Sequence, residues 1–282
     1  MLCSGNDAAV ALAEHVGGDI EGFAALMNKK ANELNLTTTN FVTPHGLDSN
    51  EHYTTAYELA RITDYALQNK KFATIVNTKS TSININGVPR TISNTNELLG
   101  NLEGVNGVKT GFTNNALRCL VTSTTRNGHQ IICVVLGADT KKIRTEDSIK
   151  LIEYAFANYE YVNIKEKIEE EFEKFLQKDC NKIKINKSKN IIPQFELANI
   201  SNEELPIQKE EIYKLNTSLQ CEEYLQAPTN VNQTIGSINV TINDKQIASA
   251  NIIIKNEVQK KNILDNFLEI LSNYTSYLEK SI

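Results

Sequence analysis

A lysine, a threonine and a glycine stand in a row at Lys109, Thr110 and Gly111, inside the stretch VNGVKTGFTNNA that begins at Val105. They follow a short apolar run, which is consistent with a β-strand. A cation and a hydroxyl at a strand edge can bind a carboxylate, and a glycine lets a substrate backbone approach closely. The triplet is therefore a candidate carboxylate-binding site. How strongly it supports a function depends on which other reactive residues the rest of the chain supplies.

A second polar cluster, Ser4-Gly5-Asn6, opens the first predicted helix. Alone, it is as well explained as a helix cap or a turn, just as Lys-Thr-Gly is as well explained as a strand end. Together the two clusters offer a serine hydroxyl, an amide, an ammonium and a threonine hydroxyl. Serine acyl transferases combine elements of these types, S-x-N and K-T-G, with an S-x-x-K nucleophile motif.

Composition limits the other function classes. The chain has 282 residues, of which 40% are hydrophobic and 22% charged, as in ordinary globular proteins of one large domain or of a large and a small one. The formal net charge is -5 without a basic block, which argues against a nucleic-acid partner. Five dispersed cysteines and four histidines show no metal-ligand spacing, so we expect neither a disulfide framework, nor a metal, nor another cofactor.

Hydrophobic periodicity predicts an α/β domain over residues 1–160. Helices are expected at 7–16 and 20–34, separated by Gly17-Gly18, and a third follows the capping box Thr55-x-x-Glu58. From Thr81 the period changes to two, and Asn86-Gly87 predicts a hairpin. Antiparallel strands are expected at 105–110, 117–125 and 130–137, and a helix from near Thr145.

A smaller β-rich domain is expected over residues 163–258. Its first part, 165–178, is dense in charge and favours a solvated helix face or a linker. Strand patterns follow at 182–185, 191–197, 211–215, 234–242 and 246–254, with Asn243-Asp244 as a hairpin turn. Residues 261–282 predict an amphipathic helix, which fits either an interfacial membrane helix or packing on another domain or partner.

The chain resembles the serine-type D-alanyl-D-alanine carboxypeptidases, which are low-molecular-mass penicillin-binding proteins. The resemblance covers SGNDAAVALAEH, NFVTPHGLD, the run from Gly104 to Ala138 and, more weakly, the run from Glu223 to Ile254. It implies an antiparallel transpeptidase/β-lactamase-like domain, a β-rich second domain and a C-terminal amphipathic membrane anchor. It also implies the extracytoplasmic face of the bacterial membrane, peptidoglycan stem peptides ending in D-Ala-D-Ala as substrate, and binding of β-lactam antibiotics.

The resemblance also assigns roles to residues. Ser4 is expected to assist proton transfer, Asn6 to bond the substrate amide, and Lys109 to stabilise charge and relay protons. The substrate-binding residues are then Thr110 for the terminal carboxylate, Gly111 for the peptide backbone, the Phe112 N–H for the oxyanion, and Arg144 near the carboxylate end. An equally good interpretation of Arg144 is a surface arginine at the start of a helix.

The chain departs from the family at the nucleophile, because no S-x-x-K occurs in its 282 residues. One interpretation is the C-terminal portion of a carboxypeptidase, with 1–160 as the later part of its catalytic domain, which by itself is inactive. The alternatives are a non-catalytic relative that binds cell-wall peptides or a partner, and a serine β-lactamase-like hydrolase.

Overall fold

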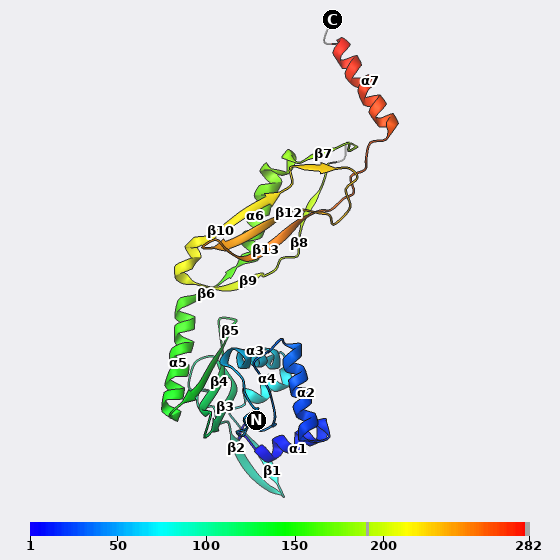
Figure 1. The fold of residues 1–282 in the computed structure, drawn as a ribbon. Coiled ribbons are helices and arrows are strands. Elements are labelled where there is room, and N and C mark those ends of the chain that lie inside the picture. The colour runs from blue at the N-terminus through cyan, green and yellow to red at the C-terminus, as the bar shows by residue number, and fades with distance from the viewer. Residues whose placement is uncertain (190–191, 280–282) are drawn as a thin grey trace. The chain divides into compact units, whose positions relative to one another are not determined.

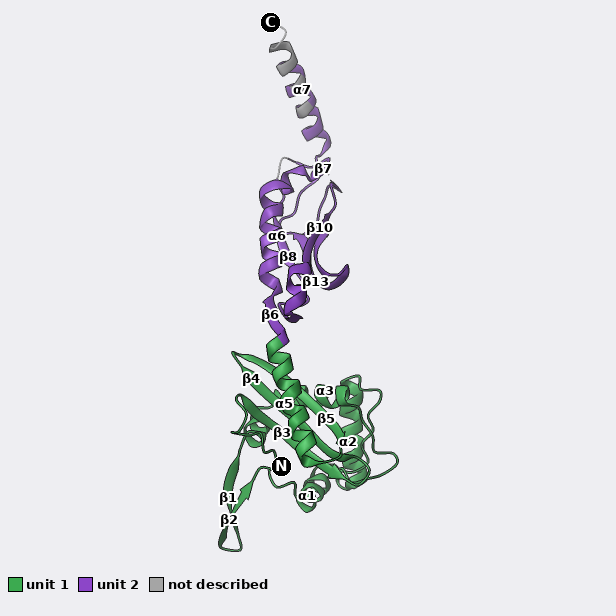
Figure 2. Cartoon of the chain, turned by 90° about the vertical axis from the view of Figure 1, so that its left-hand side faces the viewer, with its two compact units in different colours: residues 1–157 green, residues 158–282 purple. Residues whose placement is uncertain are grey.

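The computed structural model describes residues 1–189 and 192–279, which divide into two compact units, Met1–Ala157 and Asn158–Ile282 (Figure 2). The first unit holds every residue that the sequence singles out for chemistry. In the described part of the chain, no helix combines the length and apolar character needed to cross a membrane.

Four helices precede the sheet of the first unit: α1 (Asn6–Gly17), α2 (Ile20–Glu33), α3 (Ala56–Leu67) and α4 (Lys70–Val76). The first three confirm the predicted helices, whereas α4 was not predicted. The packing of α1 on α2 requires a glycine at the last residue of α1, because a Cβ on Gly17 would lie 2.3 Å from the backbone nitrogen of Phe23.

The capping box at α3 is only half formed. The Thr55 hydroxyl accepts a hydrogen bond from the Glu58 N–H at 3.2 Å, as predicted. The Glu58 carboxylate does not return to the cap. It is 6% exposed and accepts instead from the backbone N–H of Thr38 at 3.0 Å, because this loop N–H needs a partner inside the fold.

The strands of the first unit confirm the predicted antiparallel arrangement. The hairpin of β1 (Ser80–Ile85) and β2 (Val88–Ser93) turns at Asn86 and Gly87, whose φ values of 52° and 84° suit the tight turn that Asn-Gly forms. A separate sheet contains β3 (Val105–Thr113), β4 (Leu117–Arg126) and β5 (His129–Ala138) in the order β3-β4-β5. Consequently β3 pairs with β4 on one side and has an open edge on the other.

Helices cover both faces of this sheet (Figure 1). On one face, Ile152 of α5 (Lys141–Asn158) packs on Cys133 and Val135 of β5. On the other face, α4 approaches so closely that a Cβ at Gly107 would meet Val76 at 3.0 Å. The sheet is thus fixed from both sides, which holds β3 in place.

The start of α5 corrects the sequence prediction. The helix begins at Lys141, four residues before Thr145. Thr140 caps it, because its hydroxyl accepts from the Ile143 N–H at 3.1 Å and its carbonyl accepts from the Arg144 N–H at 3.1 Å. Arg144 therefore lies in the first turn of the helix and not before it.

The second unit is built on a four-stranded antiparallel sheet in the order β10-β12-β13-β8. The core-facing side of α6 (Ile164–Lys178) packs against it through Ile168, Phe172 and Phe175, so the charged stretch is a helix with one buried face. The bounds of the sheet strands are β8 (Phe195–Ala198), β10 (Leu215–Cys221), β12 (Thr234–Ile242) and β13 (Lys245–Ile254). The hairpin at Asn243-Asp244 is confirmed, since it joins β12 to β13.

Other elements of this unit differ from the prediction. The strand expected at 211–215 is wrong, because these residues fall mainly in the 3₁₀ helix η2 (Lys209–Lys214), which lies between β9 (Glu204–Gln208) and β10. The strand expected at 191–197 starts outside the described residues. The remaining elements are β6 (Tyr159–Asn163), η1 (Cys180–Lys182), β7 (Lys184–Asn186), β11 (Tyr224–Gln226) and the terminal α7 (Ile263–Glu279).

Candidate active site

Lys109 and Ser4 meet although 105 positions separate them in the sequence. The Lys109 ammonium donates a hydrogen bond to the Ser4 hydroxyl at 2.8 Å and another to the Thr110 carbonyl at 2.6 Å. The chain places Ser4 here because the residues before α1 lie beside β2 and β3 (Figure 1), where the Leu2 carbonyl accepts from the Thr95 N–H. The clusters Ser4-Gly5-Asn6 and Lys109-Thr110-Gly111 therefore lie together, and we call this place the Ser4–Lys109 corner.

Burial lowers the pKa of Lys109 below its ordinary value of 10.5, and the nearby Cys3 partly opposes this shift. Desolvation disfavours the charged form of an amine. A lysine with a lowered pKa, held on a serine hydroxyl, can both stabilise an anion and exchange a proton. The geometry thus fits the two roles expected of Lys109.

Thr110 is held by a residue that the sequence analysis missed. Its hydroxyl lies 2.6 Å from the hydroxyl of Thr95, which follows β2. The next residue, Asn96, is buried and donates from its side chain to the Gly107 carbonyl at 2.9 Å. This segment covers the first part of the β3 edge. In sequence it is a polar run after a hairpin, which is indistinguishable from an ordinary turn.

Gly111 is not required by the fold. Its φ is not positive, and a Cβ there would meet only the Cys119 Cβ at an ordinary 3.6 Å. A side chain at this position would project from the exposed part of β3, beside Lys109. The glycine therefore keeps space open at the site.

Phe112 lies after Gly111 with 52% of its surface exposed. The register places it opposite Arg118 of β4, and the Arg118 guanidinium stacks on its ring at 3.7 Å from the centroid. The exposed Phe112 ring is thus part of a cation–π pair with the half-buried Arg118, a feature that the sequence analysis did not anticipate.

Asn6 is the first residue of α1 and is exposed, two positions after Ser4. Its side-chain amide makes no hydrogen bond within the described residues. The amide is therefore open to a ligand, and its role in binding a substrate amide stays a prediction.

The loop containing Thr43-Pro44-His45-Gly46 also reaches the β3–β4 turn. Asp48 accepts from the Asn115 N–H at 3.3 Å. Behind it, the His52 ring accepts from the Val42 N–H at 3.0 Å, and burial lowers the pKa of this histidine. A neutral imidazole is the form that accepts this bond.

Arg144 has a different environment from the other site residues. It is 3% exposed, and its guanidinium pairs with the Glu97 carboxylate at 2.6 Å. Burial raises the pKa of Glu97, but hydrogen bonds from Thr145 and Arg144 outweigh it, so the net pKa is below its ordinary value. Arg144 is therefore buried and ion-paired, not a surface residue, and its contact with substrate stays a prediction.

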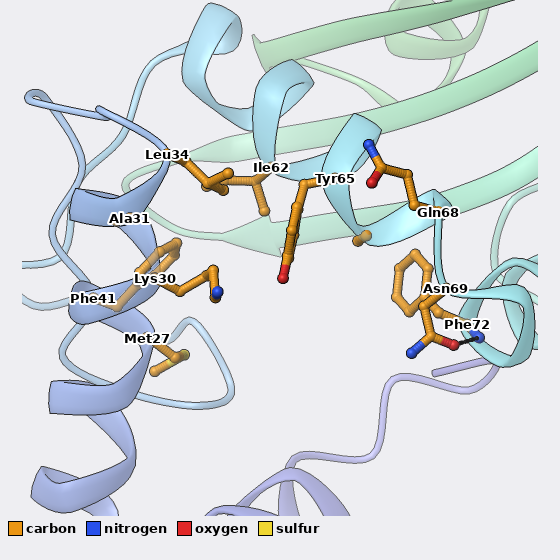
Figure 3. A pocket seen from close by; sticks show the side chains of 11 residues that line it. Met27, Lys30, Ala31, Leu34, Phe41, Ile62, Tyr65, Gln68, Asn69 and Phe72 are labelled. Carbon is orange, nitrogen blue, oxygen red and sulfur yellow. Dashed lines mark hydrogen bonds between the residues drawn. The ribbon is translucent and has the colours of Figure 1, made fainter.

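An apolar pocket of about 580 Å³ lies elsewhere in the first unit, between α2 and the pair α3–α4 (Figure 3). Side chains such as Met27, Phe41, Tyr65 and Phe72 line it, and none of the predicted site residues does. The candidate site and this pocket are therefore separate places to test for binding.

Two family models match the chain. The model described as D-alanyl-D-alanine carboxypeptidase matches residues 1–140, and the model described as the C-terminal domain of penicillin-binding protein 5 matches residues 173–260. Both S-x-N and K-T-G lie in the first match, and most of the second unit lies in the second.

Curated relatives carry similar names. The D-alanyl-D-alanine carboxypeptidase DacF of Bacillus subtilis is 28% identical over 98% of this chain and 69% of its own length. DacA of Haemophilus influenzae is 34% identical over 93% of this chain and 64% of its own length. The chain thus spans only part of the length of the relatives that it matches.

Solved structures agree. Penicillin binding protein 5 from Haemophilus influenzae superposes with a TM-score of 0.66 and 29% identity, covering 91% of this chain and 72% of that one. A mutant of the Streptomyces K15 DD-transpeptidase gives a TM-score of 0.53 and 36% identity, covering 56% of this chain and 65% of that one.

Proposed function

Because the chain belongs to the D-alanyl-D-alanine carboxypeptidase family of penicillin-binding proteins, we propose that the Ser4–Lys109 corner binds the carboxyl terminus of peptidoglycan stem peptides ending in D-Ala-D-Ala. The observation that carries this proposal is the 2.8 Å hydrogen bond between Lys109 and Ser4 at the open edge of β3. It gathers a cation and hydroxyls where a peptide can add to the sheet.

Each site residue then has a chemical task. Lys109 and the Thr110 hydroxyl bind the terminal carboxylate, and the Asn6 amide bonds the substrate amide. Gly111 leaves room for the peptide backbone, and the Phe112 N–H contributes to an oxyanion hole, a donor worth about 2.7–4 kcal/mol in acyl transfer. Ser4 assists proton transfer between the general base and the leaving amine, and Lys109 helps to relay protons.

The family reaction also needs a nucleophile, and the 282 residues contain no S-x-x-K. We therefore propose that this chain by itself binds the peptide but does not form an acyl-enzyme. It acts as the substrate-binding half of a serine acyl-transfer site.

A labelled penicillin tests whether the chain forms an acyl-enzyme. After incubation and denaturing electrophoresis, we expect no label on the chain, under conditions in which an intact serine carboxypeptidase is labelled. Covalent labelling would show that a nucleophile is present after all.

Calorimetry with Nα,Nε-diacetyl-Lys-D-Ala-D-Ala and its C-terminal amide tests whether the site binds the carboxyl terminus of the peptide. The carboxylate form should bind more tightly, because only it pairs with Lys109 and Thr110. Equal affinities for the acid and the amide would contradict the proposed carboxylate site.

A non-catalytic role is the second candidate, and the missing S-x-x-K favours it. In that case peptide binding itself is the function. A β-lactamase-like hydrolase is less well supported, because residues 173–260 match the C-terminal domain of penicillin-binding protein 5, which β-lactam hydrolysis does not need.

We further propose that α7 attaches the chain to the outer surface of the bacterial membrane. The apolar residues Leu264, Phe267, Leu268 and Leu271 recur at helical spacing and are between 44% and 63% exposed. Such a stripe fits an interfacial helix, although few cations accompany it.

A further inference from the structure

We propose that Thr95 is a positioning residue for recognition of the peptide carboxylate. It donates its hydroxyl proton to Thr110 and so leaves the Thr110 proton free for the ligand. This inference rests on the proposed function, because it assumes that the Thr110 hydroxyl donates to the terminal carboxylate. It adds to the site a residue that lies outside both S-x-N and K-T-G.

The contact between the two threonines has a direction that the ligand determines. Their hydroxyl oxygens lie 2.6 Å apart, and either oxygen can be the donor in the free chain. A hydroxyl carries one proton and two lone pairs that accept. When Thr110 gives its proton to a carboxylate, it has no second proton for Thr95. Thr95 must then be the donor in the contact between them.

The Thr110 hydroxyl depends on Thr95, because the neighbouring cation does not hold it. The Lys109 ammonium donates to the Ser4 hydroxyl and to the Thr110 backbone carbonyl, not to the Thr110 hydroxyl. Within the residues that the structure describes, Thr95 is therefore the one hydrogen-bond partner of this hydroxyl.

A hydrogen bond from Thr95 improves Thr110 as a donor in two ways. Hydrogen bonds in a chain polarise one another, so a hydroxyl that accepts a bond donates a stronger one. The contact also fixes the Thr110 side chain before the ligand arrives, which reduces the entropy that binding costs. Both effects matter most for a charged acceptor, because hydrogen bonds to carboxylates are stronger than bonds between neutral groups.

Thr95 itself is fixed by its backbone and by the residues on either side. Its N–H donates to the Leu2 carbonyl at 3.2 Å, in the segment that leads to α1. The side chain of Asn94 donates to two backbone carbonyls near the end of α4, both at 3.2 Å. On the other side, the buried Asn96 donates to the Gly107 carbonyl at 2.9 Å. The Thr95 hydroxyl is thus presented from an anchored segment.

The fold has little need of this contact. Thr95 is exposed and Thr110 is half-buried. Water can replace either partner of an exposed hydrogen bond, so the net contribution of such a bond to stability is small. We therefore expect loss of the Thr95 hydroxyl to change ligand binding more than it changes folding.

Calorimetry with diacetyl-Lys-D-Ala-D-Ala and its C-terminal amide tests this role. Thr95→Val removes the donor and keeps the shape of the side chain. It should weaken binding of the acid about twofold to tenfold, the range for one neutral hydrogen bond. Binding of the amide should weaken less, so the preference for the acid should fall. Thr95→Ser keeps the hydroxyl and should restore the preference.

Thr91→Val is the matched control, because Thr91 is an exposed threonine of β2 and lies outside the site. It should leave the affinity for both peptides unchanged. Circular dichroism and thermal unfolding check that each variant is folded.

A double-mutant cycle shows whether Thr95 acts through Thr110. Residues that act through a shared contact give non-additive effects. Thr110→Val removes the hydroxyl that Thr95 is proposed to orient. In that background, Thr95→Val should therefore cause no further loss of affinity for the acid.

The outcomes separate this inference from the function on which it rests. Equal loss of acid and amide binding by Thr95→Val would indicate a general disturbance, and a further loss in the Thr110→Val background would indicate direct contact with the ligand. Either result, or a full acid preference in Thr95→Val, would overturn the role of Thr95 while the proposed function stands. If the wild type does not prefer the acid, the proposed function fails and this inference fails with it.

Discussion

The Lys109 ammonium donates to the Ser4 hydroxyl at 2.8 Å, so the two clusters that the sequence offers for chemistry form one hydrogen-bonded corner. Either cluster alone is equally well explained as a local structural feature, a helix cap or a strand end. Their contact brings an amine with a lowered pKa, a serine hydroxyl and the open edge of β3 into one place.

The first prediction concerns the protonation of Lys109. Burial lowers its pKa, so the neutral amine forms at a lower pH in the folded chain than in the unfolded chain. The rate of reaction with an amine-specific acylating reagent, followed at this residue by mass spectrometry, should have a lower pH midpoint in buffer than in urea. An equal or higher midpoint in the folded chain would contradict the burial of this amine.

The second prediction uses two glycines, Gly111 in β3 and Gly104 directly before it. Gly111→Ala should keep or raise the unfolding free energy, by about 0.4–1 kcal/mol, because its backbone suits alanine, but it should weaken peptide binding. Gly104 is the matched control, since it has a φ of 78° and a Cβ there would lie 2.4 Å from the Thr125 carbonyl oxygen. Gly104→Ala should lower the free energy of unfolding by about 1–3 kcal/mol. Normal peptide binding by Gly111→Ala would argue against a substrate backbone at this position.

The third prediction concerns Glu97 and pH. Glu97→Gln leaves the Arg144 cation buried without its counter-charge. The free energy of unfolding at pH 7 should fall by about 2 kcal/mol. This is less than the roughly 3–5 kcal/mol typical of a fully buried pair, because Glu97 is 31% exposed.

The pH dependence follows from the lowered pKa of Glu97. Its contribution is fully present above the unfolded value, near the ordinary 4.5, and is lost as the pH falls through the lower folded value. Denaturant unfolding of the wild type and of Glu97→Gln should therefore converge in acid. A constant difference across this range would show that charge is not the cause.

The fourth prediction concerns α7. Full-length chain should float with liposomes, and a version that ends at Lys261 should not, because the exposed apolar stripe is the proposed contact. Phe267→Ser should weaken flotation, whereas Asn266→Ser, at an exposed polar position of the same helix, should not. Equal flotation of the full and the shortened chain would rule out α7 as the anchor.

The sequence was sufficient where local chemistry decides structure. Asn86-Gly87 and Asn243-Asp244 can turn a hairpin by themselves, and both do. The hydrophobic spacing of the first three helices is equally local. The motif pair Ser4-Gly5-Asn6 and Lys109-Thr110-Gly111 picked out two clusters that the fold brings into hydrogen-bond contact.

The features that the sequence did not predict depend on tertiary contacts. The run from Glu211 to Leu215 has a strand-like composition, but the chain uses this region mainly as the short helix η2 between two strands. Thr95, Asn96 and Glu97 act at the site only because β3 and α5 lie next to them. Likewise, the stacking of Arg118 on Phe112 requires the β3–β4 register, which the turn sequence alone does not fix.

The most direct test of the central claim is a chemical-shift titration of the ¹⁵N-labelled chain with diacetyl-Lys-D-Ala-D-Ala. We predict that the largest shifts fall on the backbone amides of residues 4–6 and 109–113, and that the C-terminal amide of the peptide reduces them. Shifts confined to the pocket lined by Met27, Phe41, Tyr65 and Phe72, with none at Ser4 or Lys109, would contradict the assignment of this corner as the peptide-binding site.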